Sequence, residues 1–469
     1  MDDRLNQQML RVGPILAVGV AIVTHALGLP GPAAICAGTA ALCALWWITE
    51  CVPMGVVGLV PLVVFPVTGI LGEKQVAGYY WNDMIMLLMG GSFLSAAMEH
   101  AGAHRRLALT MVRAVGRGGA KTFIAGMMLT TALLSMWISN TATTLMMVPI
   151  ALAVLGQANA ETLRVPLLLG IAYSSSLGGM ATPIGTPPNV IFKAQMEQLY
   201  GVSYSFPDWM RIGVPIVIVL LPLVWWLLTR RLGSDLRLEI PHPGPWRKPE
   251  VRVLAILVLT ALAWTFRENP AGGWTGLLPT LAAEGQSMIR DTTIAIAAAL
   301  AVFLCPAGDP ADPGKRLLSW SEASAKVPWG ILIMFGGGLA LAGGFEESGL
   351  SAAIAEKLVV LKGVPPLLTL VLICAVITML TEVTSGTATA SLMLPILASL
   401  AEATGMSPAT VMIAGTISCS CAFMLPVATA PNAIVYSAGI KTSQMARAGV
   451  WINFAAVLVI AVISHWLVR

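Results

Sequence analysis

Apolar residues run along this chain in long stretches, and short polar or Pro- and Gly-rich segments separate them. A helix that spans the hydrocarbon core of a bilayer needs roughly 20 apolar residues. About eleven stretches suit such spans, at residues 13–30, 33–50, 54–72, 82–101, 165–196, 209–230, 251–267, 291–306, 328–347, 408–440 and 447–468. Two longer ones suit re-entrant hairpins, at 120–156 and 364–401. The pattern predicts an all-α polytopic membrane protein.

Three motifs recur in the same order at a nearly constant offset. GGSFLSAAMEHAG from Gly90 matches GGLALAGGFEESG from Gly337, 247 positions later; its glycine pairs favour close helix packing. SNTAT from Ser139 matches SGTAT 246 positions later, and TPIGTPPN from Thr182 matches LPVATAPN 243 positions later. Because the predicted spans start the two hairpins from opposite sides, we expect two inverted repeats. Such repeats with broken helices place a substrate site near the bilayer midplane.

Composition and charge agree with a chain surrounded by lipid. Hydrophobic residues make up 57% and charged residues 11% of the chain, which excludes a soluble globular protein. Lys and Arg concentrate in the loops near 105–121, 230–248, 315–326 and 441–447. By the positive-inside rule these loops and the N-terminus are cytoplasmic, in the cell (inner) membrane, and no removable signal peptide is expected. The net charge of +4 indicates no nucleic-acid partner, and the seven cysteines are expected to be packing residues.

Polar residues interrupt each hairpin at its predicted tip. Ser139, Asn140 and Thr141 lie within apolar sequence, where a polar cluster is costly unless it meets protein, water or a ligand. Such residues cap helix N-termini, whose free N–H groups and positive dipole end suit an anion. The segment from Ser385 to Thr387 repeats this arrangement from the other half. We therefore expect two helix ends to converge on one small anion.

Prolines break a helix in each half and complement these tips. Pro183, Pro187 and Pro188 in one half, and Pro426 and Pro431 in the other, leave backbone carbonyls free. Carbonyl and hydroxyl oxygens suit a dehydrated hard cation. The candidate cation ligands are Ser135, Ser139, Asn140 and Gly185 in the first site, and Thr381, Thr384, Gly386 and Ala428 in the second.

Charge balance favours coupling to a cation. Neither tip and neither break contains Lys or Arg, so hydroxyl groups, helix dipoles and an accompanying cation have to balance a dianion. The acid nearest a tip is Glu382, three residues before Ser385. Two interpretations stay open for it: a paired group that fixes the hairpin, or a proton-coupling residue.

At these motifs the sequence resembles the divalent anion/sodium symporter family of dicarboxylate, citrate and sulfate carriers, and the resemblance spans essentially the whole chain. It implies a homodimer in which a transport domain moves like an elevator against a scaffold domain. It also implies that the tips bind substrate carboxylates and, with the helix breaks, sodium ions. The substrate-binding residues that it implies are Ser139, Asn140, Thr141, Thr186, Pro187, Ser385, Gly386, Thr387 and Thr429.

The resemblance also implies a division of the chain into five parts. Scaffold helices and an interfacial helix occupy 1–119 in repeat 1 and 251–363 in repeat 2. A hairpin and transport helices occupy 120–236 and 364–469, and a cytoplasmic linker occupies 237–250. The short segments at 102–118 and 349–362 are the expected interfacial helices.

The sequence departs from the family pattern at two positions of the second half. Gly386 stands where the family usually has Asn, and Ala430 stands for a Pro. An Asn side chain supplies a carbonyl oxygen and two donors, and Gly supplies none, so the second sodium site loses a ligand. The expected function is sodium-coupled symport of C4-dicarboxylates such as succinate, malate and fumarate. Sodium-independent dicarboxylate or tricarboxylate exchange and sulfate-type oxyanion transport remain alternatives.

Functions of other classes are disfavoured. The chain has no HExxH, GxSxG or paired-carboxylate arrangement, so we expect no enzyme activity and no organic cofactor. An open channel would not need two inverted hairpins. The expected partners are a small dicarboxylate or related anion, Na⁺ as coupling ion, membrane lipid and a second copy of the chain.

Overall fold

The secondary structure of this chain is almost entirely helical. The computed structural model describes residues 3–116, 118–158, 161–233, 244–268, 273–277, 282–283, 286–309 and 312–467. Within these residues the only sheet is a two-stranded antiparallel one, in which Ala282 pairs with Ser287. Its strands are β1 (Ala282–Ala283) and β2 (Gln286–Ser287). The predicted all-α class is confirmed.

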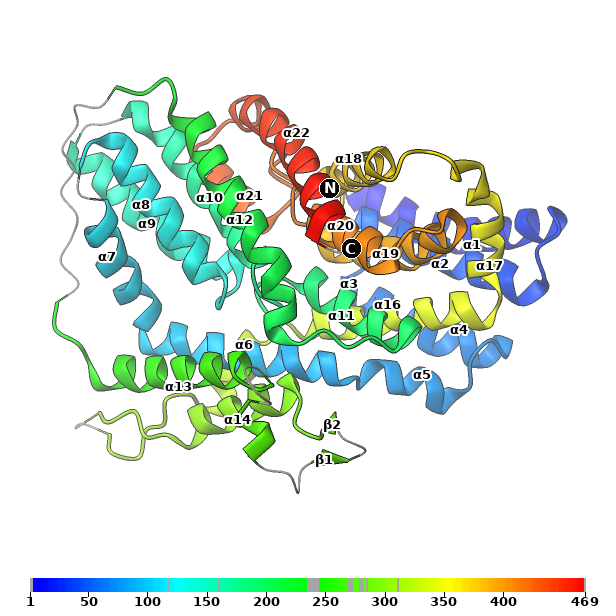
Figure 1. Ribbon diagram of the computed structural model, residues 1–469, viewed down its shortest axis with the longest axis horizontal. Coiled ribbons are helices and arrows are strands. Elements are labelled where there is room, and N and C mark those ends of the chain that lie inside the picture. Colours follow the sequence, from blue (N-terminus) through cyan, green and yellow to red (C-terminus); the bar gives the residue numbers. More distant parts are fainter. Residues whose placement is uncertain are drawn as a thin grey trace.

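The first half of the chain contains twelve of the described α-helices. They are α1 (Asp3–Ala26), α2 (Gly31–Thr49), α3 (Met54–Gly58), α4 (Val60–Thr68), α5 (Glu73–Tyr80), α6 (Asp83–Ala101), α7 (Ala103–Val115), α8 (Ala120–Ser135), α9 (Asn140–Ala158), α10 (Arg164–Met180), α11 (Pro187–Tyr200) and α12 (Phe206–Thr229). The 3₁₀ helix η1 (Glu161–Leu163) precedes α10. Figure 1 shows α5 and α6 end to end, crossing much of the length of the molecule.

The second half contains ten of the described α-helices. They are α13 (Lys248–Thr265), α14 (Asp291–Leu304), α15 (Trp320–Lys326), α16 (Trp329–Glu347), α17 (Leu350–Leu358), α18 (Pro366–Val383), α19 (Gly386–Thr404), α20 (Pro408–Ser418), α21 (Ala430–Ser437) and α22 (Thr442–Leu467). The 3₁₀ helices η2 (Thr275–Leu277) and η4 (Val359–Leu361) lie in its connections. Residues 237–243 of the expected linker lie outside the described part of the chain.

The described helices suit a chain that crosses a membrane several times. Eight described helical segments are long and apolar enough to span a bilayer, and two of these, α18 and α19, form a hairpin. Outside the first hairpin, shorter apolar helices lie at Met54–Thr68, Asp291–Leu304 and Pro408–Ser418. These helices make the chain a multi-pass membrane protein.

Both predicted hairpins are present, on opposite sides of the molecule. Figure 1 shows α8 and α9 on one side, α18 and α19 on the other, and α10, α12 and α22 between them. α10 packs against α8 and α9, and α20 packs against α18 and α19. Each hairpin therefore lies against the helix whose break we expected to complete its site.

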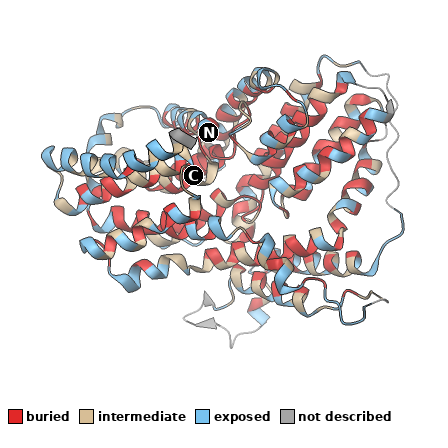
Figure 2. Cartoon of the chain, turned by 180° about the vertical axis from the view of Figure 1, so that it is seen from behind, coloured by how far each residue is buried: buried red, intermediate tan, exposed pale blue. Residues whose placement is uncertain are grey.

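The surface and the interior fit a lipid environment. Ile15, Val18 and Ile22 on α1 are 71%, 60% and 64% exposed, a stripe that lipid rather than water would cover. Buried residues gather in the helices at the middle of the molecule (Figure 2). The glycine pairs allow the predicted close packing, because a Cβ at Gly337 would lie 2.3 Å from the carbonyl oxygen of Gly58.

Candidate functional site

The first hairpin tip has the predicted cap. α9 begins at Asn140, directly after Ser139, whose Oγ accepts a 3.3 Å hydrogen bond from the backbone N–H of Ala142. The hydroxyl of Ser135 donates a 2.6 Å hydrogen bond to Oδ1 of Asn140. Ser175 on α10 donates to the backbone carbonyl of Asn140 at 2.8 Å. These bonds fix the tip against the neighbouring broken helix.

The second tip repeats the backbone arrangement without the cap bond. Ser385 has an extended backbone, and α19 begins at Gly386, but the Ser385 side chain caps no N–H group. Thr384 and Thr389 share a 2.6 Å hydrogen bond between their hydroxyl groups. The first N–H groups of α19 therefore have no helical partner and are available to an anion.

The two helix breaks are held in the same way. Asn189 donates from Nδ2 to the carbonyl of Gly179 at 3.0 Å and of Thr182 at 2.7 Å. Asn432 donates from Nδ2 to the carbonyls of Ala422 and Leu425, each at 3.0 Å. The two sets are related by the same offset, 243 positions, as the Pro-rich motifs. This recurrence identifies Gly179 and Ala422 as equivalent positions.

Both tips and both breaks meet at one cavity of about 520 Å³. Every one of the nine predicted substrate-binding residues lines it: Ser139, Asn140, Thr141, Thr186, Pro187, Ser385, Gly386, Thr387 and Thr429. The predicted cation ligands Gly185 and Ala428 also line it, whereas Ser135, Thr381 and Thr384 do not. Residues from four separate stretches of sequence thus converge on one space.

Two of the predicted first-site oxygens face a common point. A Cβ at Gly179 would lie 2.6 Å from Oδ1 of Asn140 and 3.1 Å from the carbonyl oxygen of Gly185. Nδ2 of Asn140 would lie 3.1 Å from the same Cβ, so Gly179 packs tightly against Asn140 and Gly185, and Ser135 donates a hydrogen bond to Oδ1 of Asn140. Such a set of neutral oxygens suits a hard monovalent cation, so these residues fit sodium.

The second half differs at both of these positions. Ala422 has a methyl group where Gly179 has none, and Gly386 has no amide where Asn140 has one. A Cβ at Gly386 would lie 2.3 Å from the carbonyl oxygen of Cys419, so no side chain fits there without a shift. The hydroxyl groups of Thr381 and Thr384 donate to the carbonyls of Ile377 and Leu380, each at 2.8 Å.

Glu382 fastens the second hairpin to the second break. Its buried carboxylate accepts from the backbone N–H groups of Phe423, Met424 and Leu425 at 2.7–3.1 Å. It also accepts a 2.6 Å hydrogen bond from the side-chain amide of Asn453 on α22. Every one of these partners is a donor, and an ionised carboxylate only accepts. The geometry favours the structural interpretation of this residue over proton coupling.

Charged residues that the motifs did not reveal line the other wall of the cavity. Glu50, Glu99 and Lys326 come from the end of α2, the last turn of α6 and the end of α15. Lys326 donates from Nζ to Glu99 Oε2 at 2.8 Å. Glu50 has a φ of 50°, in the left-handed region that residues other than glycine seldom adopt. Glu99 lies within a repeated motif, but a partner 227 residues away could not be inferred from sequence.

One buried ion pair and a more exposed set join α11 to the start of α14. Lys193 on α11 donates to Asp291 on α14 at 3.0 Å, and both side chains are buried. At the end of α11, Glu197 pairs with Arg290, which also contacts Asp83 at 3.2 Å. These charges lie on the side predicted to face away from the cytoplasm.

The chain is similar to known transport proteins over most of its length. A family model described as "Citrate transporter" (CitMHS) matches residues 44–417. "Sodium-dependent dicarboxylate transporter SdcS" of Staphylococcus saprophyticus is 39% identical over 91% of this chain and 84% of that protein. The protein of the same name from Staphylococcus aureus strain USA300 is 37% identical over 97% of this chain and 90% of that protein.

A solved structure shares the fold. The Alcanivorax borkumensis YdaH transporter, whose structure is described as having an unusual topology, is similar with a TM-score of 0.59. The similarity covers 89% of this chain and 98% of that one at 14% sequence identity. At this identity the likeness concerns the arrangement of helices alone.

Proposed function

The chain belongs to the citrate transporter (CitMHS) family, and on that premise we propose that it is a secondary transporter that carries C4-dicarboxylates across the cell membrane together with sodium. The match and the relatives also confirm the resemblance to the divalent anion/sodium symporters that the motifs indicated. Two relatives similar over nearly their whole length are named as sodium-dependent dicarboxylate transporters, which supports the substrate class and the coupling ion.

One observation carries the proposal: two hairpin tips and two helix breaks converge on one cavity of about 520 Å³. The N-termini of α9 and α19 both reach it, with Thr141 and Thr387 on its wall. Each helix N-terminus supplies roughly half a positive charge and free N–H groups. Two such ends suit an anion with a carboxylate at each end of a short carbon chain.

Sodium coupling is supported by the oxygens around Gly179. Ser135, Asn140 and Gly185 would hold the ion beside the anion site, where its charge offsets part of the substrate's charge. Because the second half has Ala422 in place of Gly179 and Gly386 in place of Asn140, we propose one well-formed sodium site rather than two. The loss of potential sodium ligands in the second half also favours the alternative function, sodium-independent exchange of one anion for another.

We assign transport to the two hairpins and the broken helices beside them, within 120–236 and 364–469, and the scaffold to 1–119 and 251–363. Movement of the first set against the second, as in an elevator, and assembly as a homodimer are parts of the same proposal. The charged residues on the cavity wall, Glu50, Glu99 and Lys326, belong to the side predicted to be cytoplasmic. The ion pair of Arg290 with Glu197 belongs to the side predicted to face away from the cytoplasm.

Uptake of labelled succinate into proteoliposomes tests the function. We expect uptake that rises with an imposed inward sodium gradient and needs no internal substrate. Uptake that occurs only with internal dicarboxylate, whatever the sodium gradient, would indicate exchange. Uptake of sulfate with none of succinate or citrate would contradict the substrate class. Thr387→Ala and Ser139→Ala are expected to raise the half-saturating succinate concentration in the same assay.

A further inference from the structure

A second cavity, of about 650 Å³, adjoins the central one between α7 and α9. We call it the antechamber. Four residues line both cavities: Glu99, Ser139, Thr141 and Lys326. The first hairpin tip therefore forms the boundary between the antechamber and the central site, and a solute that passes through the antechamber reaches the tip directly.

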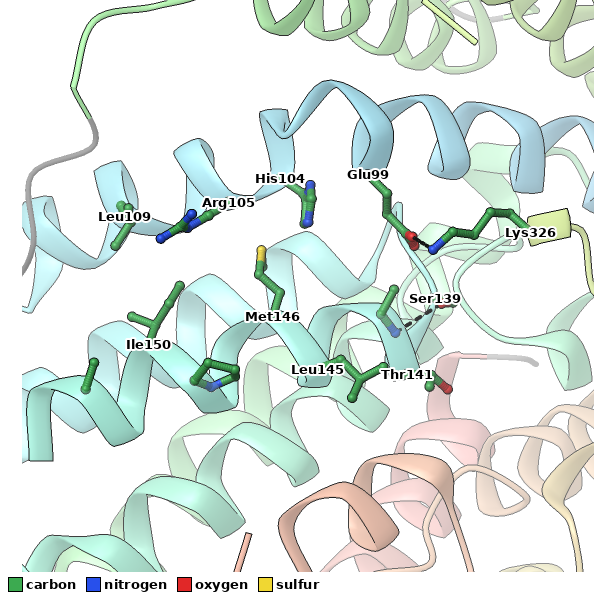
Figure 3. A pocket seen from close by; sticks show the side chains of 13 residues that line it. Glu99, His104, Arg105, Leu109, Ser139, Thr141, Leu145, Met146, Ile150 and Lys326 are labelled. Carbon is green, nitrogen blue, oxygen red and sulfur yellow. Dashed lines mark hydrogen bonds and ion pairs between the residues drawn. The ribbon is translucent and has the colours of Figure 1, made fainter. Parts of the chain in front are cut away.

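The antechamber carries more positive charge than the central site. Arg105 and Lys326 line it together with one acid, Glu99, whereas the central cavity has Lys326 with Glu50 and Glu99. Figure 3 shows Arg105 between α7 and α9 and His104 pointing toward Met146. Arg105 is exposed and has no hydrogen-bond or ion-pair partner among the described residues. Its guanidinium is free to bind a carboxylate with two parallel hydrogen bonds.

His104 adds a polar group to this wall rather than a second free cation. Its Nδ1 lies 3.0 Å from the carbonyl oxygen of Met98. Burial lowers the pKa of His104, so its ring is neutral near pH 7. The positive charge in the antechamber therefore comes from Arg105 and Lys326.

The pair of Glu99 and Lys326 lies where the two cavities meet (Figure 3). Glu99 is in the last turn of α6, where the helix dipole disfavours a carboxylate, and its side chain is only 17% exposed. Lys326 offsets that charge, and its own side chain is 60% exposed. Without Lys326, an uncompensated acid would face any anion that enters the central cavity.

We propose that the antechamber is a second anion site, in which Arg105 and Lys326 hold a dicarboxylate on its way between the cytoplasm and the hairpin tips. This inference rests on the proposed function. Leu109, Leu145 and Ile150 supply apolar walls of the same cavity. A ligand with a hydrocarbon chain between two carboxylates fits such a site better than a compact inorganic oxyanion does. Neutralisation of Glu99 by Lys326 lets the anion move on to the tips.

Succinate uptake by purified charge variants at low and high ionic strength, with sodium fixed and choline chloride varied, tests the inference. At low ionic strength we expect Arg105→Gln to raise the half-saturating succinate concentration roughly three- to tenfold, with the maximal rate nearly unchanged. The difference should shrink at about 0.5 M salt, because the charges are screened there. Arg105→Lys keeps the charge and should restore most of the affinity.

Two further variants separate a site from a general effect of charge. Lys326→Gln is expected to weaken succinate binding more than the double variant Glu99→Gln/Lys326→Gln, because the single change leaves Glu99 unpaired. Arg231→Gln, at an exposed position that lines neither cavity, is the control and should match the unaltered protein. Thermal unfolding of each purified variant checks that it is folded.

The outcomes distinguish this inference from the proposed function. If Arg105→Gln and Lys326→Gln keep the original half-saturating concentration at both ionic strengths while Thr387→Ala weakens uptake, the antechamber is no binding site and the transporter assignment stands. If the unaltered protein takes up no succinate under any sodium gradient, the proposed function fails, and the ligand assigned to the antechamber fails with it.

Discussion

Gly386 faces the carbonyl oxygen of Cys419 so closely that a Cβ at this position would lie 2.3 Å from it. Cβ atoms approach other heavy atoms this closely only if something shifts, and both partners here are backbone. The second hairpin tip therefore packs directly against the second helix break. This contact requires a glycine at position 386, and the same glycine lacks a side chain that could bind sodium.

Gly386→Ala is accordingly expected to destabilise the protein by about 1–3 kcal/mol, the usual range for overpacking a tight contact. Thermal unfolding of the purified protein in detergent measures the change. Gly156→Ala is the matched control, because Gly156 also lies in a hairpin helix but a Cβ there would meet nothing within 4 Å. Equal stability of the two variants would contradict the packing argument. Gly386→Asn would meet the same obstacle, so it cannot simply add a sodium ligand.

Gly179→Ala should weaken sodium binding selectively. Its methyl group would lie 2.6 Å from Oδ1 of Asn140 and 3.1 Å from the carbonyl oxygen of Gly185, so these oxygens would have to shift. We expect the half-saturating sodium concentration for succinate uptake to rise by roughly tenfold or more, as for loss of a metal-ligand environment. Asn140→Ala should act in the same direction. If Gly179→Ala leaves the sodium titration unchanged, the ion does not bind at this position.

The sodium titration itself should be nearly hyperbolic. One well-formed site predicts a Hill coefficient of about 1 for sodium at saturating succinate, since cooperative activation requires at least two coupled sites. Initial rates of succinate uptake over a range of sodium concentrations give this value. A coefficient close to 2 would mean that the second half binds sodium despite Gly386 and Ala422.

Glu382→Gln is expected to lower stability rather than change the pH dependence of transport. A glutamine amide would direct its NH₂ group toward donors that now point at a carboxylate oxygen, at a cost of roughly 2–4 kcal/mol. Thermal unfolding should therefore show a lower midpoint. Should the variant keep its stability and lose only the pH dependence of uptake, Glu382 would be a proton-coupling residue instead.

Removal of one partner from the pair of Lys193 and Asp291 should be costly. Lys193→Met leaves the buried carboxylate of Asp291 without its closest cation, and loss of one member of a buried pair costs on the order of 3–5 kcal/mol. Arg267 lies 3.4 Å from the other oxygen of Asp291 and should limit the loss. Arg211→Met, which removes a largely exposed cation paired with Asp208, is the control and should change stability by about 0–1 kcal/mol. Similar unfolding midpoints for the two variants would contradict the importance of burial.

Sequence predicted the hairpins and the breaks, because local rules determine each of them, and the nine residues that the family resemblance implied all line the central cavity. The polar tips and the prolines are costly in lipid unless they serve a site, and the repeated motifs link the two halves. The partner of Glu99 could not be predicted, since Lys326 is brought to it by folding. The roles of Gly179 and Cys419 could not be predicted either. They depend on short distances between residues far apart in the chain, which no sequence pattern encodes. Helix ends were less exact: α1 begins at Asp3, well before the expected residue 13.

The unequal capping of the two tips has a consequence for how the halves share their task. Ser139 accepts a hydrogen bond from an N–H group of α9, and Oδ1 of Asn140 lies close to Gly179. Ser385 caps nothing, and Gly386 leaves the start of α19 bare. On the proposed function, the first tip holds the oxygens that would suit a cation, and the second tip leaves the helix start uncapped for an anion. Mutations near the first tip would then alter ion coupling, and mutations near the second tip would alter substrate choice.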